Sequence, residues 1–215
     1  MKKIILLLMV VIGFAAKAQI THTSNGDVDK NAQEVLSKAA KKMNTTAVSF
    51  SVTMINKDSQ KKETGKMSAQ VLYDKSKYRV SFDNQILYSD GSSVWHWNKE
   101  TNECTINKLD PNATDDLMNP ALLLKSYQKN FRAKYIRTES NGTAIIDLTP
   151  KKSRSYYKIR LLIVSSTGVL KQMEMHNYDG SCGEFHVSNF KAGVQCTEAD
   201  FALPKGAKVE IIDMR

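Results

Sequence analysis

The side chains best suited to covalent or metal chemistry in this chain are three cysteines and four histidines. Cys182 lies between His176 and His186 in the sequence, and a thiolate beside an imidazole can act as a nucleophile. Gly180 and Gly183 flank this cysteine, which is typical of a hairpin tip and favours a structural or disulfide-bonded residue. The enzymatic interpretation predicts that replacing Cys182 with serine abolishes function.

Motifs that mark enzymes and cofactor sites are missing. The sequence contains no glycine-rich phosphate loop, no Gly-x-Ser-x-Gly elbow and no His-Glu-x-x-His pattern. A metal site built from Cys182, His186 and Cys196 would lack a compact fourth ligand. We therefore predict no catalytic residues, no cofactor and no metal.

The cysteines are odd in number, so at least one stays free or pairs with another chain. Cys182 and Cys196 flank a plausible strand and its return, and we expect a disulfide between them. Such a bond needs an oxidising compartment.

The first residues are typical of an exported protein. Lys2 and Lys3 precede an apolar run from Ile4 to Ala16, and small residues follow at the end of this run. The run has about 13 residues, whereas a membrane span needs about 20. We predict a signal peptide over residues 1–18 and a single, unanchored domain over residues 19–215.

The charge of the chain points away from nucleic acid. The 31 basic and 22 acidic residues give a net charge of +9. Basic residues are scattered along the sequence, which indicates solvated strand faces, or a weak attraction to anionic lipid heads or an acidic partner. We expect no nucleic acid among the partners of this chain.

The hydrophobic pattern predicts two helices within a β protein. Apolar residues recur at helical spacing over residues 27–43, and a second helix starts at Asn119-Pro120. Elsewhere about ten segments alternate with period two, as in Val48 to Met54, and short turns separate them. We expect a mainly β fold with a few helices, in which a large antiparallel sheet is curled on itself. An open sheet of this kind leaves a cavity on its concave side, and the short central helix is suited to a plug or lid.

Four segments resemble the LolA family in the order in which that family carries them. They are the strand, Ser-Asp-Gly turn and Trp-rich strand of residues 86–98, the Pro-led apolar helix of residues 119–124, Leu-Thr-Pro-Lys at 148–151, and the closing element at 199–206. The resemblance extends from about Val35 to Val209.

The resemblance implies a periplasmic carrier that takes the acyl chains of lipoproteins from an inner-membrane ABC exporter to an outer-membrane acceptor. It implies an incomplete antiparallel β-barrel, a strongly curved sheet with a helical lid over an apolar cavity. We expect a monomer whose empty cavity is held shut by a lid latch, and the matching positions fall near Ala40, Lys75 and Leu124. Arginine beside proline is usual where this chain has Lys75-Ser76. Lysine lacks the planar fork with which arginine bonds several carbonyls.

The residues that we expect to line the acyl-chain cavity are apolar and come from several strands and the central helix. Trp95 and Trp97 point to one sheet face, as core or as cavity wall. A slipped register would reverse the face of any strand. The predicted lining is Phe50, Val52, Met67, Val71, Tyr78, Val80, Phe82, Trp95, Trp97, Leu122 and Leu123, with Leu124 beside them.

Two other functions fit the same pattern. A protein of this fold could sense mislocalised lipid and bind a signalling partner, although sensors of this kind usually carry an additional domain. The cargo could also be a glycolipid or another lipid.

Overall fold

The computed structural model describes residues 29–109 and 120–215, except the side chains of residues 120–122 and 125. The predicted signal peptide therefore lies outside the described residues. The described elements follow one another as α1 (Lys30–Asn44), β1 (Val48–Lys57), β2 (Glu63–Asp74), β3 (Lys77–Phe82), β4 (Gln85–Ser89), β5 (Ser93–Asn98), β6 (Glu103–Lys108), α2 (Pro120–Asn130), β7 (Phe131–Thr138), β8 (Thr143–Pro150), β9 (Tyr156–Val164), β10 (Leu170–Asn177), β11 (Cys182–Ala192), η2 (Glu198–Phe201) and β12 (Glu210–Asp213).

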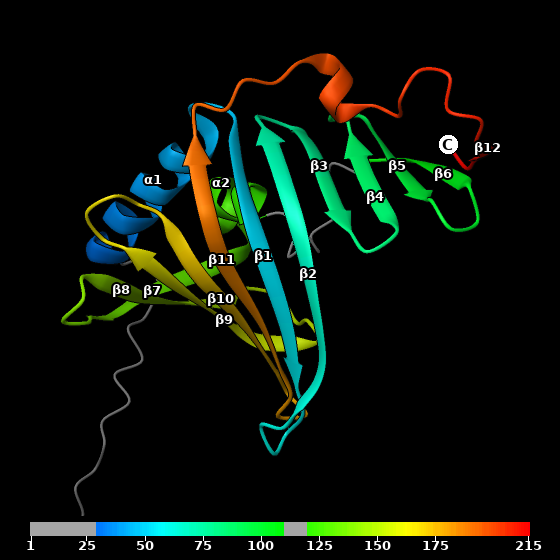
Figure 1. Ribbon diagram of the computed structural model, residues 1–215. Coiled ribbons are helices and arrows are strands. Elements are labelled where there is room, and N and C mark those ends of the chain that lie inside the picture. Colours follow the sequence, from blue (N-terminus) through cyan, green and yellow to red (C-terminus); the bar gives the residue numbers. More distant parts are fainter. Residues whose placement is uncertain (1–28, 110–119) are drawn as a thin grey trace, which may run out of the picture.

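The strands form one open sheet in the order β12-β6-β5-β4-β3-β2-β1-β11-β10-β9-β8-β7. Every neighbouring pair is antiparallel except β12 and β6, which run parallel. Strands β7 to β11, β1 and β2 curve around the two helices, whereas β3 to β6 and β12 extend to one side (Figure 1). The mainly β prediction is confirmed, but the sheet has 12 described strands, one parallel pair and two separate edges.

Helix α1 forms because its apolar residues fall on one face. Ala32, Val35, Leu36, Ala39 and Met43 are buried, and the opposite face carries lysine and glutamate. The carboxylate of Asp29 caps the first turn and accepts a hydrogen bond from the amide N–H of Ala32 at 3.0 Å.

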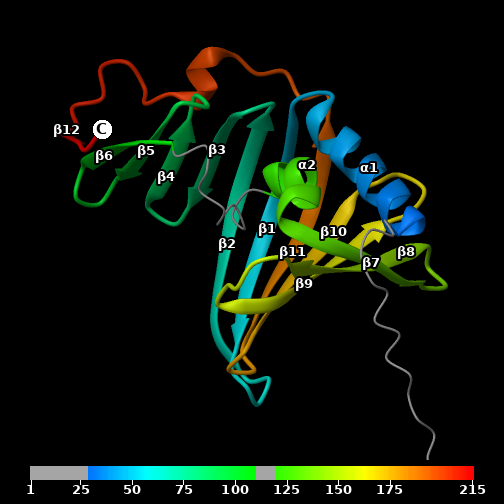
Figure 2. The same ribbon diagram turned by 180° about the vertical axis from the view of Figure 1, so that it is seen from behind.

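Both helices lie on the concave face of the sheet (Figure 2). Leu123, Leu124 and Tyr127 of α2 join the buried face of α1 and the apolar residues of β8 and β9 in one core. Full burial of a leucine or isoleucine contributes about 1.5–3 kcal/mol, so this core holds the helices on the sheet. Among the described helices, none is long and apolar enough to cross a bilayer.

A second, smaller core lies on the other face of β2 to β6. Here Leu72, Tyr88 and Ile106 are buried, and η2 brings the buried Phe201 to this face. The contact is supported by an ion pair of Lys77 with Glu198 and another of Arg79 with Asp200. The segment that follows β11 therefore leads to the face of β2 to β6 that lies opposite the two helices.

Candidate functional site

An apolar groove lies on the concave face, where strands β1, β2, β3, β10 and β11 meet. Cross-strand register places Phe50 opposite Val71, Val52 opposite Ala69, and Met54 opposite Met67 on this face. Because side chains alternate along a strand, the serine and threonine residues between them point to the other face. The groove is lined by Phe50, Val52, Met54, Met67, Ala69, Val71, Val80, Leu170, Met173, Phe185 and Val187.

The groove is narrow in this structure. Its cavity volume is about 50 Å³, within a wider apolar depression that encloses about 560 Å³ and is continuous with solvent. A water molecule needs about 10–15 Å³ of cavity volume measured in this way, and a cavity of about 150 Å³ holds benzene. A long alkyl chain would therefore need the lining to move apart. Met54, Met67 and Met173 are unbranched and flexible, so they can adapt to such a chain.

Five residues of the predicted lining, Phe50, Val52, Met67, Val71 and Val80, lie in the groove. Tyr78 lies opposite Tyr73 on the same face and packs against the core, and Phe82 follows Val80 by two positions on this face. Leu123 and Leu124 are buried in the core under the helices, and the side chain of Leu122 lies outside the described residues.

Trp95 and Trp97 do not face the groove, which corrects the expectation that they line the same hollow. Trp95 lies opposite Tyr88 and Ile106, and Tyr88 lies opposite Arg79, whose neighbour Val80 is the groove residue. The tryptophans are therefore on the face of the second core. Alternation along the strand predicts that Trp95 and Trp97 lie on the same face of the sheet. It does not predict whether that face is the concave one, and here it is not.

Six groove residues were missed by the sequence analysis: Met54, Ala69, Leu170, Met173, Phe185 and Val187. Met54 and Ala69 belong to alternating runs that had already been assigned to strands, so their period alone could have found them. Phe185 and Val187 also alternate, but their place beside β1 comes from the pairing of β11 with β1, which links distant parts of the chain.

The end of α1 is joined to the turn between β2 and β3 through Tyr73. Its hydroxyl hydrogen-bonds the backbone carbonyl of Lys75 and lies 3.2 Å from Oδ1 of Asn44, the last residue of α1. The amide of Asn44 in turn donates to the carbonyl of Ala40 at 2.8 Å. Burial, with a smaller contribution from the charge of Asp74, raises the pKa of Tyr73 to about 12, so its proton stays in place at neutral pH.

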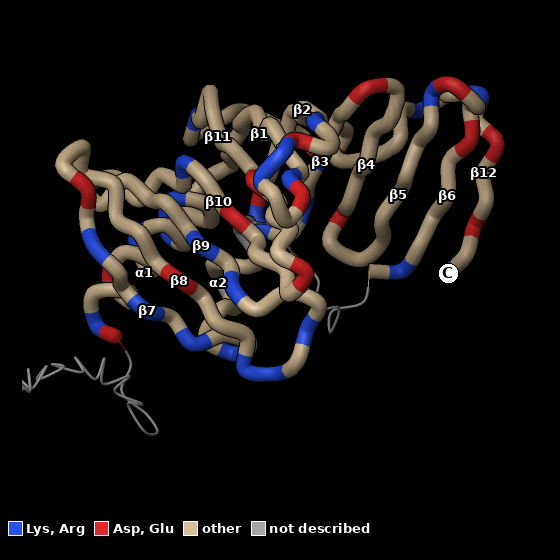
Figure 3. Tube along the Cα trace, turned by 90° about the horizontal axis from the view of Figure 1, so that it is seen from below, with Lys and Arg blue, Asp and Glu red and all other residues tan. Residues whose placement is uncertain are grey.

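Charged residues form a ladder on the outer, convex face of β7 to β11. Basic and acidic residues alternate from β7 to β10 (Figure 3), and register places Lys134 opposite Asp147, Asp147 opposite Arg160, and Arg160 opposite Glu174. On β11, Glu184 lies opposite Glu174. The guanidinium of Arg160 donates to both oxygens of Asp147, at 2.7 and 2.9 Å. These charges leave the convex face unsuited to an apolar ligand.

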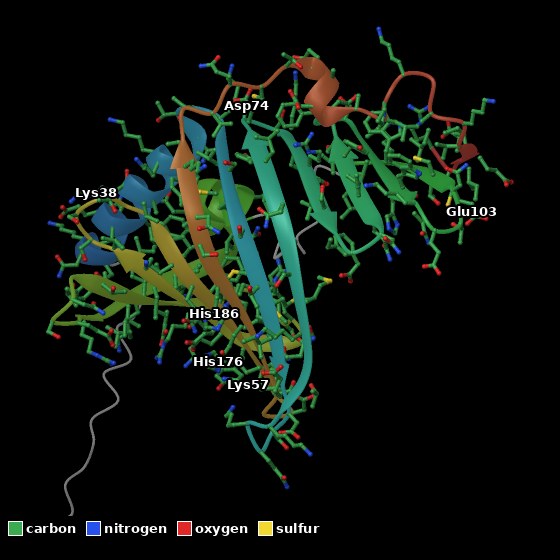
Figure 4. All side chains as sticks on the ribbon, in the orientation of Figure 1. Lys38, Lys57, Asp74, Glu103, His176 and His186 are labelled. Atoms are coloured by element: carbon green, nitrogen blue, oxygen red, sulfur yellow. The ribbon has the colours of Figure 1, made fainter. Side chains whose placement is uncertain are left out.

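Cys182 lies on this convex face, opposite His176 and Lys57 (Figure 4 labels the last two). Burial and the negative charges of Glu174 and Glu184 raise the pKa of the Cys182 thiol. Burial, and next the charge of Lys158, lower the pKa of His176. Both shifts oppose the thiolate and imidazolium pair of a cysteine nucleophile.

The expected disulfide between Cys182 and Cys196 is corrected by the structure. All three cysteines lie in the described residues, and all are free. Cys182 is the first residue of β11, whereas Cys196 follows the far end of this 11-residue strand. Strands rise about 3.3 Å per residue, so the two residues lie far beyond the Cα separation of about 7 Å that a disulfide allows.

Known proteins are similar to this chain in sequence and in fold. Residues 41–204 match the family model described as Outer membrane lipoprotein carrier protein LolA. The chain belongs to the LolA family. An outer-membrane lipoprotein carrier protein of Actinobacillus pleuropneumoniae is 24% identical over 98% of this chain and 95% of its own length, and one of Serratia proteamaculans is 24% identical over 98% of both.

A solved structure supports the fold assignment. An uncharacterised conserved protein from Thermus thermophilus superposes with a TM-score of 0.59 at 16% identity, over 85% of this chain and 98% of the other. LolA proteins are carriers and not enzymes, which confirms the expectation that this chain has no catalytic role.

The positions that the LolA resemblance links to a lid latch lie as follows. Ala40 packs against the core from α1, and Leu124 is buried in it from α2. Lys75 is exposed in the turn after β2, with a positive φ of 58°, and contributes its backbone carbonyl to the Tyr73 hydroxyl. Tyr73 and Asn44, which the sequence analysis did not single out, make the polar contact at this place.

Proposed function

We propose that this LolA-family protein carries lipoproteins through the periplasm, from an inner-membrane ABC exporter to an outer-membrane acceptor, with acyl chains of the cargo in the apolar groove. The observation that carries the proposal is the lining of the groove, in which every residue is apolar and comes from one of five neighbouring strands. Membership of the family supports the nature of the cargo.

Energetics favours a carrier whose groove is closed when empty. Each shielded methylene contributes about 0.8 kcal/mol, so a chain of about 16 carbons would gain on the order of 12 kcal/mol if fully buried. Such a chain would be released too slowly for transfer. If part of this free energy is used to separate the lining residues, a downstream acceptor can compete for the cargo.

Helices α1 and α2 are the elements best placed to move. They cover the concave face, and α1 is joined to the sheet by a polar contact at each end: Asp29 with β7, and Asn44 with Tyr73 of β2. Separation at the Tyr73 contact would free the C-terminal half of α1, whose Met43 lies in the same core as Phe50. We propose that this contact serves as the latch, with Ala40 and Leu124 as its apolar part.

The proposal is tested by filling the groove without changing the rest of the surface. Ala69 lines the groove, whereas the neighbouring Ser68 points to the convex face and lies near Thr53 at 3.3 Å between hydroxyls. Ala69→Phe should abolish the soluble complex that forms when the protein is purified with a triacylated lipoprotein. Ser68→Phe, the matched control, should leave the complex intact.

Two results would overturn the proposal. One is a lipoprotein that still depends on detergent in the presence of the unmodified protein. The other is an equal yield of complex with Ala69→Phe, provided that circular dichroism shows the variant folded. Native mass spectrometry of the gently purified protein distinguishes a lipoprotein from a glycolipid or another lipid.

A further inference from the structure

A second hollow lies at the C-terminal end of α1. Its lining comes from α1, the loop after it, the turn between β9 and β10, and the end of β11, and its cavity volume is about 380 Å³. We call it the cationic groove, and it is lined by Lys38, Lys41, Lys42, Thr45, Thr46, Ser166, Thr167 and Ala192.

The chemistry of the lining is that of an anion site. Three lysines and four residues with hydroxyl groups line the groove, and no carboxylate is among its described lining residues. The hydroxyl of Thr45 donates to the carbonyl of Lys41 at 2.7 Å. Lys38 is partly neutralised, because its Nζ lies 2.9 Å from a carboxylate oxygen of Glu34. Lys41 and Lys42 lie in the last turn of α1, and neither forms an ion pair with a carboxylate in the part of the chain that the structure describes.

Two of the hydroxyls have a proton to donate. The Thr46 oxygen accepts a hydrogen bond from the N–H of Gly193 at 3.1 Å, and the Thr167 oxygen accepts one from the N–H of Val169 at 3.4 Å. An oxygen that accepts in this way keeps its O–H free for another partner. Hydroxyl donors beside ammonium groups suit a phosphate group, which offers several acceptor oxygens.

The walls of the groove are held in place. Gly168 follows Thr167 in the β9–β10 turn with a φ of +73°, and a Cβ on it would lie 2.7 Å from the backbone carbonyl of Lys38. The turn therefore packs directly on the backbone of α1, and Lys38 lies beside it in Figure 4. The two walls keep their separation without a ligand, which lowers the entropic cost of binding.

The cationic groove is a neighbour of the apolar groove. Nζ of Lys42 lies 6.0 Å from the ring centre of Phe190, and this ring stacks on Phe50 with centres 6.2 Å apart. Phe50 lines the apolar groove. The rings of Phe190 and Phe50 therefore connect Lys42 of the cationic groove to the apolar groove.

We infer that the cationic groove binds a phosphate group, through Lys41 and Lys42 and the hydroxyls of Thr46 and Thr167. The chemistry is shared by the headgroup of an anionic phospholipid and by free phosphate. The inference does not depend on the proposed lipoprotein cargo, because the ammonium and hydroxyl groups lie outside the apolar groove.

The test uses two arms and a matched variant. In one arm, the protein is sedimented with vesicles of phosphatidylcholine alone or mixed with phosphatidylglycerol. In the other, inorganic phosphate is titrated while the amide NMR signals of residues 166–168 are followed. K41Q/K42Q removes two charges from the groove, and K205Q/K208Q removes two charges from the C-terminal segment.

We expect K41Q/K42Q to weaken binding about 25-fold, since each lysine near an anionic surface contributes roughly a fivefold change. K205Q/K208Q should change it by less than about twofold. Binding to mixed vesicles alone identifies a headgroup as the ligand, and a saturable response in both arms identifies phosphate itself. Equal losses in both variants, or no response in either arm, would overturn the inference. Soluble complex formation with lipoprotein, measured on K41Q/K42Q, reports separately on the carrier function.

Discussion

The hydroxyl of Tyr73 lies 3.2 Å from Oδ1 of Asn44 and so joins the last residue of α1 to strand β2. The same hydroxyl bonds the carbonyl of Lys75. Tyr73 is only 4% exposed, so these polar groups meet in a largely dry place beside the core. The hydroxyl has a single proton, which the Asn44 oxygen and the Lys75 carbonyl share, and its removal takes this donor away from both acceptors.

Replacing Tyr73 with phenylalanine should lower the free energy of unfolding by about 1–2 kcal/mol. It should also increase binding of a fluorescent apolar dye to the empty protein, because α1 separates from β2 more often. Urea denaturation and dye titration measure the two effects. Tyr157→Phe, at an exposed tyrosine, is the control and should change neither. Unchanged dye binding by a destabilised Tyr73→Phe would contradict the latch.

The other end of α1 depends on Asp29. One oxygen of its carboxylate caps the helix at Ala32, and the other accepts from the backbone N–H of Tyr135 on the edge strand β7 at 2.8 Å. Asp29→Ala removes both hydrogen bonds and should cost about 2 kcal/mol of stability. Asp29→Asn keeps one acceptor and should cost less. A loss of under about 0.5 kcal/mol with alanine, the range of an ordinary surface substitution, would show that the cap contributes little.

Acid should destabilise the protein through His176. Its pKa is lowered from the usual 6.5, first by burial and then by the charge of Lys158. Below pH 6.5 the unfolded chain takes up the proton before the folded protein does, so stability falls until the pH passes the lowered value of the folded state. Well above pH 6.5 the histidine is neutral in both the folded and the unfolded state and makes no such contribution.

His176→Gln should therefore reduce the drop in Tm between about pH 7.5 and about pH 5.5. The control is His186→Gln, because His186 also lies 3.1 Å from a glutamate on its own strand but has a side chain 40% exposed, against 18% for His176. A drop in Tm that is the same in the unmodified protein and in His176→Gln would locate the acid sensitivity elsewhere. The lowered pKa of Glu184 acts at still lower pH and should remain in His176→Gln, whereas His186→Gln removes one of the groups that lower it.

The cysteines should behave as three thiols. Cys104 is fully buried and Cys182 is 5% exposed, whereas Cys196 is less buried. A maleimide should therefore label Cys196 first in the folded protein, as mass spectrometry can follow. Reducing agent should leave the Tm unchanged. A disulfide would be shown by an intact mass two hydrogens below the mass expected for three thiols, if a reducing agent restores the expected mass.

The two faces of the sheet show how far the sequence could be interpreted. Alternation in β1 and β2 placed Phe50, Val52, Met67 and Val71 on one side, and this is the concave side that the helices cover. In β5 the same alternation placed Trp95 with Trp97 but could not say which face was concave. Both faces of β2 to β6 carry apolar residues, because the segment around Phe201 covers the second one.

The sequence pattern also could not predict which distant segments of the chain lie side by side. The sequence predicts a strand that starts at Cys182 and a return of the chain before Cys196. In the structure β11 extends to Ala192, and no described strand returns beside it before Cys196. The LolA resemblance placed the polar part of the latch at Lys75, because this residue matches a latch position of the family. The polar contact comes from Tyr73, which the β2 strand carries to the end of α1.

The most direct test of the central claim is to find where an acyl chain lies. A photo-crosslinking amino acid is placed at Val71 in the apolar groove, or at its neighbour Gln70, which points to the convex face. The protein is loaded with a triacylated lipoprotein and irradiated, and crosslinked acyl chains are identified by mass spectrometry. We predict crosslinks from position 71 and none from position 70. Crosslinks from position 70, with none from position 71, would contradict the account.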